Sequence, residues 1–83
     1  MNEVEETLRV LNTQIKSFKK ETDNLTEAFE EFKKQCKTLL DENYFIIVCN
    51  LFESAIGYYE ACYEESAAVR KEILNKYNIP SEE

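Results

Sequence analysis

The acidic side chains of this sequence are the first candidates for chemistry. Glu60 and Glu64 lie four positions apart, a spacing that places two carboxylates on one helix face, where they could hold a divalent cation. Carboxylate metal sites in helical bundles normally add the histidine of an E-x-x-H motif, and the sequence contains no histidine. We therefore expect no metal site and no cofactor.

The three cysteines, Cys36, Cys49 and Cys62, also lack the surroundings of a catalytic centre. A cysteine nucleophile needs a nearby histidine or a positive field, and no Lys or Arg occurs between Lys37 and Arg70. The cysteines form no C-x-x-C pair, so we interpret them as reduced core thiols. A single glycine cannot build a phosphate-binding loop. The sequence predicts a protein that is not an enzyme.

Length and composition favour one small helical domain spanning residues 1–83. The chain is 43% hydrophobic and 12% aromatic, which is typical of an ordered protein, and its single Gly and single Pro argue against many strands. A chain of 83 residues buries little core, so support from another chain is expected.

The net charge of the chain limits the classes of partner that it can bind. The formal net charge of −7 would repel a phosphate backbone over most of the surface, so direct nucleic-acid binding is not expected. The N-terminal sequence MNEVEETLRV is acidic and amphipathic, unlike a signal peptide, and the longest apolar run, YFIIVC, is too short to span a bilayer. These features predict a cytoplasmic protein with no membrane contact.

Two ladders of apolar residues, each advancing by alternate steps of four and three, predict two long helices. The first predicts a helix over about 3–40, and the second a helix over about 43–77, with a turn at 41–43 and a tail at 78–83. The first ladder comprises Val4, Leu8, Leu11, Ile15, Phe18, Thr22, Leu25, Phe29, Phe32, Cys36 and Leu39. The second comprises Phe45, Val48, Phe52, Ala55, Tyr59, Cys62, Ser66, Val69 and Ile73.

The short connection predicts an all-α fold, a long antiparallel helical hairpin of the coiled-coil type, and two copies could assemble into a four-helix bundle. An alternative is a three-helix chain with a break near Asp23, because the residues at 22–24, TDN, could cap a new helix. In the hairpin the two ladders mirror one another about residue 42, which pairs Leu39 with Phe45, Phe32 with Phe52, Phe29 with Ala55 and Phe18 with Ser66.

The second helix is apolar over more than the stripe that one neighbouring helix can cover. We therefore predict a partner-binding surface on it, in which small residues allow close approach of another backbone. A tolerated, solvent-facing Gly57 is the alternative reading of that glycine. The predicted surface comprises Tyr44, Ile47, Leu51, Ser54, Gly57, Tyr58, Ala61 and Tyr63.

The same helix carries an acidic face without a basic residue, formed by Glu53, Glu60, Glu64 and Glu65. The leading hypothesis is a non-catalytic protein–protein interaction module that self-associates through the second helix, most simply as a dimer, and binds or regulates another protein of unknown identity. One alternative is a small acidic inhibitor of the anti-defence type, a nucleic-acid mimic that occupies a basic groove of a target enzyme. A third is a helical sponge for a small ligand.

Overall fold

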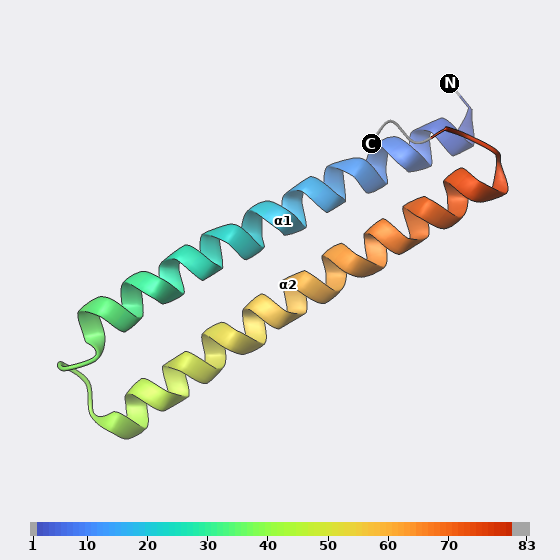
Figure 1. The fold of residues 1–83 in the computed structure, drawn as a ribbon. Coiled ribbons are helices and arrows are strands. Elements are labelled where there is room, and N and C mark those ends of the chain that lie inside the picture. Colours follow the sequence, from blue (N-terminus) through green and yellow to red (C-terminus); the bar gives the residue numbers. More distant parts are fainter. Residues whose placement is uncertain (1, 81–83) are drawn as a thin grey trace.

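Two long antiparallel helices joined by a short turn make up the protein (Figure 1). The computed structural model describes residues 2–80, in which α1 spans Glu3–Cys36 and α2 spans Glu42–Lys76. The predicted all-α hairpin is confirmed. The molecule measures 55 × 19 × 15 Å, and its radius of gyration of 17.8 Å exceeds the value of about 12 Å expected for a compact chain of this length.

Side-chain caps begin both helices. The Asn2 side chain accepts a hydrogen bond from the backbone N–H of Glu5 at 2.8 Å, and the Asp41 carboxylate accepts one from the N–H of Asn43 at 2.9 Å. Each cap satisfies a donor that the first helical turn leaves free. Acidic residues at the start of α1 and lysines in its last turn complement the helix dipole.

The turn between the helices lies earlier than the sequence predicts. Because α1 ends at Cys36 rather than near residue 40, the connection occupies 37–41 instead of 41–43. The Cys36 carbonyl accepts hydrogen bonds from the N–H groups of Leu39 and Leu40, both at 3.2 Å, while Asp41 takes an extended conformation to cap α2. Leu39 is consequently 82% exposed, and its predicted place in the seam opposite Phe45 is wrong.

Helix α1 continues unbroken through Thr22, Asp23 and Asn24, so the three-helix alternative is wrong. The Thr22 hydroxyl donates to the backbone carbonyl of Phe18 at 2.9 Å. This local bond satisfies the hydroxyl on the helix itself, and the residue can therefore occupy a seam position without interrupting α1.

The seam between α1 and α2 is aromatic near the turn. Phe32 contacts Phe52 as predicted, with ring centroids 5.7 Å apart, and also stacks on Phe45 at 5.3 Å. Phe29 stacks on Phe52 at 5.2 Å rather than facing Ala55. The earlier turn explains this shift, because it moves the point about which the two ladders mirror one another toward the N-terminus.

Farther from the turn the aromatic contacts continue. Phe18 lies beside Tyr59, with centroids 6.3 Å apart, and lines a shallow pocket together with Ser66, the neighbour that the sequence predicts. Beyond this point the Nε–H of Arg70 donates to the Asn12 side-chain oxygen at 2.7 Å and ties the open end of the hairpin together.

Burial is shallow along the whole seam. Leu74, with 8% of its surface exposed, is the only buried side chain between residues 2 and 80, whereas most ladder residues are half-buried and Val69 is exposed. A chain this size has a thin margin of stability even with a full core, so each aromatic contact in the seam carries a large share.

Replacing Phe32 by Ala should lower the free energy of unfolding by about 3 kcal/mol, the lower end of the range for loss of a phenyl ring, because the ring is only half-buried. Urea denaturation followed by circular dichroism measures this loss. Leu39→Ala is the control, since this exposed turn residue should change the stability by less than about 0.5 kcal/mol. Equal losses in both variants would contradict the observed position of the turn.

Candidate functional site

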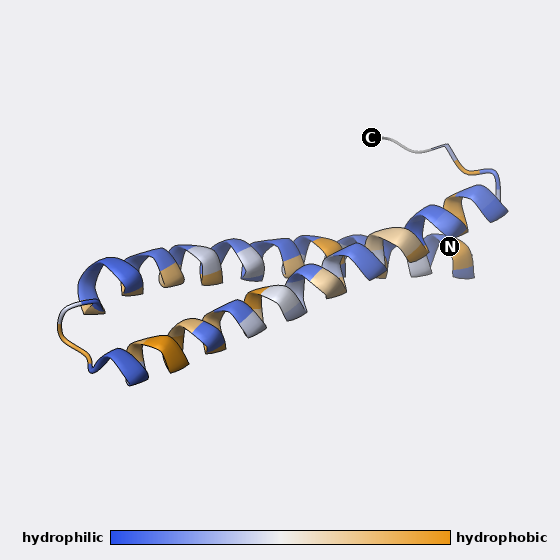
Figure 2. Ribbon diagram, turned by 60° about the horizontal axis from the view of Figure 1, so that its bottom comes forward, coloured by the Kyte–Doolittle hydropathy of each residue, from blue (hydrophilic) through white to orange (hydrophobic). Residues whose placement is uncertain are grey.

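A second ladder of residues runs along the outside of α2. We call it the outer ladder. It advances by alternate steps of three and four, each member one position before a seam residue and therefore about 100° around the helix from α1. Hydrophobic residues colour the ribbon strongly where α2 leaves the turn (Figure 2). The outer ladder comprises Tyr44, Ile47, Leu51, Ser54, Tyr58 and Ala61.

Every member of the outer ladder is exposed. The exposed fraction is 65% for Tyr44, 64% for Leu51 and 65% for Tyr58, which is unusual for large apolar side chains in regular spacing on one helix face. These are residues that the sequence assigns to a partner-binding surface, and α2 brings them onto one continuous stripe. The stripe has the width and the period of a second helix-packing seam.

Two other predicted members of this surface lie elsewhere. Gly57 falls outside the outer ladder, and a Cβ atom built on it would meet nothing within 4 Å, so the glycine faces open space in the hairpin. Tyr63 is half-buried on the opposite flank of the α1–α2 seam, where it lines a separate pocket described below. The outer ladder alone therefore forms the apolar candidate surface.

Tyr58 is held at the centre of this surface by its neighbours. Its ring packs edge-on against Tyr59, with centroids 5.5 Å apart, and Tyr59 in turn contacts Phe18 in the seam. Hydrogen bonding to the Cys62 thiol, followed by the charge of that group, raises the pKa of Tyr58. A phenol is already neutral at physiological pH at its ordinary pKa of about 10, so Tyr58 can enter an interface without burying a charge.

The predicted acidic residues divide between two directions. Glu53, Glu60 and Glu64 are exposed and lie off the outer ladder, with Glu60 and Glu64 along a groove that Lys19 and Thr22 of α1 also line, whereas Glu65 continues the line of the outer ladder. No group of carboxylates and thiols within residues 2–80 has the arrangement needed to hold a metal ion. We keep the name acidic face for Glu53, Glu60 and Glu64, which lie on the side of α2 away from the outer ladder.

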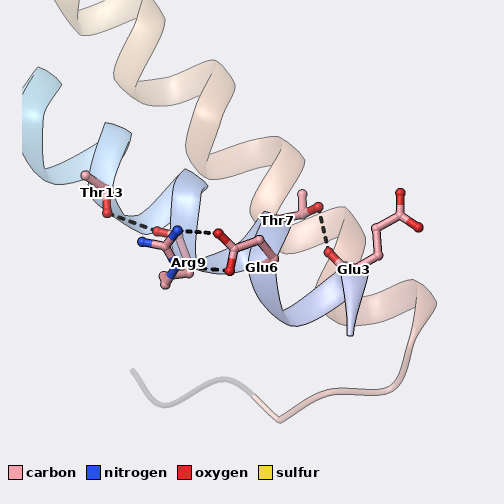
Figure 3. A network of polar contacts seen from close by, with 5 residues as sticks. All are labelled: Glu3, Glu6, Thr7, Arg9 and Thr13. Carbon is pink, nitrogen blue, oxygen red and sulfur yellow. Dashed lines mark hydrogen bonds and ion pairs between the residues drawn. The ribbon is translucent and has the colours of Figure 1, made fainter. Parts of the chain in front are cut away.

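The polar contacts near the start of α1 are local. Figure 3 shows Arg9 paired with Glu6, and the hydroxyls of Thr7 and Thr13 donating to the backbone carbonyls of Glu3 and Arg9 at 2.8 and 3.1 Å. The hydrogen bond between Arg9 and Glu6 lowers the pKa of the glutamate and raises that of the arginine. All partners are three or four residues apart and exposed, so this network supports the helix and forms no site.

A pocket of about 400 Å³ opens between the helices near the free end of the hairpin. We call it the basic pocket. It lies on the flank of the seam opposite the outer ladder and is lined by Asn12, Ile15, Lys16, Tyr63, Ala67, Arg70, Lys71, Leu74, Asn75 and Ile79. The sequence analysis did not predict this pocket. The sequence nevertheless contains a signal for it, because three of its cations have no acidic residue three or four positions away on the same helix.

The end of α2 closes one side of the basic pocket. Asn78 adopts a left-handed conformation with φ 53°, its N–H donates to the Asn75 carbonyl at 3.3 Å, and the N–H of Ile79 donates to the Leu74 carbonyl at 2.9 Å. This pair of bonds is the Schellman motif, which folds the following residue back onto the last turns of a helix. Ile79 thereby reaches Leu74 and lines the pocket.

Comparison with known proteins provides no relative from which a function could be transferred. Searches of protein-family models, curated proteins and solved structures find no match to this chain. Neither α1 nor α2, which make up nearly all of the described chain, has the length and apolar character needed to cross a membrane. The function must therefore be inferred from the outer ladder, the acidic face and the basic pocket.

Asn78→Ala should lower the free energy of unfolding by about 1 kcal/mol, because a β-carbon is disfavoured in the left-handed conformation that Asn tolerates. Asn78→Gly is the matched control and should retain or raise the stability, since glycine adopts this conformation freely. Thermal denaturation of the two variants measures the difference. If alanine and glycine gave the same stability, the Schellman turn would not form in solution.

Proposed function

We propose that the protein is a non-catalytic interaction module that self-associates through the outer ladder of α2 and presents its remaining surface to another protein. The observation that carries this proposal is the regular spacing of the exposed apolar residues of the outer ladder. Apolar residues on a surface that only contacts water would not be expected to follow the period of a helix-packing seam.

The weak core of the hairpin supports association. No side chain in the described part of the chain is fully buried, and small domains with so little burial commonly gain stability from another subunit. A second helix on the outer ladder would cover large apolar side chains such as Leu51 and Tyr58. Two hairpins joined in this way form a four-helix arrangement, with each α2 packed on its own α1 and on the second copy.

The outer ladder is complementary to itself when two copies run antiparallel. A two-fold axis passing between residues 52 and 53 would set Leu51 against Ser54, Ile47 against Tyr58 and Tyr44 against Ala61 of the second copy. Two of these layers combine a large with a small side chain, which is how a packed seam fills its volume. This complementarity supports a second copy of the chain as the first partner.

A parallel arrangement would set Glu65, which continues the outer ladder, against its own copy. In the antiparallel pair Glu65 instead lies opposite the turn of the second copy, which contains both Lys37 and Asp41. The acidic face formed by Glu53, Glu60 and Glu64 points away from the interface in either copy. It remains available to a further protein.

Tyr58→Lys should abolish self-association and leave the helix content nearly unchanged, because the ammonium group reaches water in a free hairpin but not in a closed interface. Sedimentation velocity and circular dichroism at micromolar concentration measure the two properties. Tyr77→Lys is the matched control, since this exposed tyrosine lies at the end of α2, off the outer ladder. A wild-type chain that is a folded monomer, or a Tyr58→Lys variant that still associates, would contradict the proposal.

The register can be tested with a compensating charge. Ile47→Glu should also prevent self-association, but a mixture of the Ile47→Glu and Tyr58→Lys chains should form a mixed dimer, because the antiparallel register brings the new carboxylate beside the new ammonium. A mixture that stays monomeric, while each variant remains folded, would exclude this register.

The acidic face favours a second candidate function, an inhibitor that occupies the basic nucleic-acid groove of a target enzyme. Glu53, Glu60 and Glu64 are exposed, and no ion pair between residues 2 and 80 involves them. Capture of such a target should weaken strongly between about 0.05 and 0.5 M salt, because exposed charges are screened over this range. Capture that is unchanged in high salt would argue against the inhibitor and for an apolar contact.

A further inference from the structure

The lysines and arginines of the two helices differ in whether an acidic residue lies within reach on the same helix. Arg9, Lys19, Lys20, Lys33, Lys34 and Lys76 each have an Asp or Glu three or four positions away, the spacing at which helical side chains meet. Lys16, Arg70 and Lys71 have none. All three of these unpaired residues line the basic pocket.

Within residues 2–80 this convergence has no counter-charge. Among these residues no Asp or Glu lines the basic pocket, and no ion pair involves Lys16, Arg70 or Lys71. Glu60 and Glu64 line a separate groove, together with Lys19, that shares only Tyr63 with the basic pocket. A chain with a net charge of −7 thus gathers three cations around one cavity, where an anion would relieve their mutual repulsion.

Arg70 is already oriented toward such a ligand. Its Nε–H donates a hydrogen bond to the side-chain oxygen of Asn12 at 2.7 Å, and this bond fixes the plane of the guanidinium group at the edge of the seam. Its other N–H groups make no hydrogen bond within the described residues and are arranged to bind two oxygens of one carboxylate or phosphate.

The opposite wall of the pocket is apolar. Ile15 of α1, Leu74 of α2 and Ile79, folded back by the Schellman turn, face the same cavity. A small inorganic anion would leave this wall in water, whereas a molecule with an apolar body would cover it. The volume of about 400 Å³ is within the range of small-molecule sites.

We propose that the basic pocket binds an amphipathic anion, a small molecule with a carboxylate or phosphate head and an apolar body. Arg70 and Lys16 hold the head from the two helices, Lys71 adds charge, and Ile79 covers the body. The pocket and the outer ladder lie on opposite flanks of the seam, so the site stays open in the proposed dimer and does not depend on it.

The test is a titration of the full-length, isotope-labelled chain, followed by amide NMR shifts. Decanoate and decyl phosphate, below their micellar concentrations, should shift the amides of Ala67 and Lys71. Inorganic phosphate and decanol, which carry only the head or only the body, should bind at least about tenfold more weakly.

Lys16→Gln should weaken decanoate binding about tenfold, the effect of losing one charge-assisted contact, while the fold is unchanged because Lys16 is exposed. Lys20→Gln is the matched control, one helical turn away with the same change in charge, and should bind like the wild type. Equal binding by both variants would overturn the proposal, as would shifts centred on Leu51 and Tyr58. Sedimentation of Lys16→Gln should match the wild type, which separates this test from that of the dimer.

Discussion

A single line of contact between two helices determines what this protein can bury. A helix presents its residues around a full circle, and one neighbour covers only a narrow stripe of it. The seam residues are therefore half-buried, even where aromatic rings such as Phe29 and Phe52 stack directly. Leu74 is the exception because Ile79 approaches it from a third direction.

The two flanks of this contact line have opposite chemistry. On one flank the outer ladder places large apolar side chains in water at regular spacing, and on the other the basic pocket combines cations with an apolar wall. Both flanks draw most of their residues from α2, whose side chains change direction by about 100° from one residue to the next. One helix thus presents three separate faces, of which one packs on α1, one is the proposed surface for a second chain and one lines the pocket proposed for a small ligand.

The sequence predicted the helices well because their apolar spacing reflects burial directly. It placed α2 within one residue at each end and identified the seam from Val4 to Cys36. The prediction was wrong at Leu39. An apolar residue that continues the spacing of the ladder gives the same sequence pattern whether the helix continues through it or ends before it. The turn position depends on Asp41 competing as a cap, and an error there shifts the pairing of the aromatic residues along the seam.

The candidate surfaces were predictable to different degrees for a related reason. The outer ladder lies within one helix, so its period could be recognised without knowledge of the neighbour, whereas Tyr63, which the sequence grouped with the same surface, lies on the other flank of the seam and lines the basic pocket. The basic pocket needs residues from α1, from α2 and from the chain beyond α2, and their convergence depends on the register.

Helix electrostatics explain only part of the basic pocket. Arg70 and Lys71 lie toward the C-terminus of α2, where the helix dipole favours positive charge within the last turns, and a purely structural role would account for them. Lys16 lies near the middle of α1, far from either end of that helix, so the dipole gives it no such benefit. It lines the same cavity as Arg70 and Lys71, where a bound anion would reduce the repulsion among the three cations. The helix dipole can therefore explain Arg70 and Lys71 but not Lys16, whereas binding of an anion would explain all three.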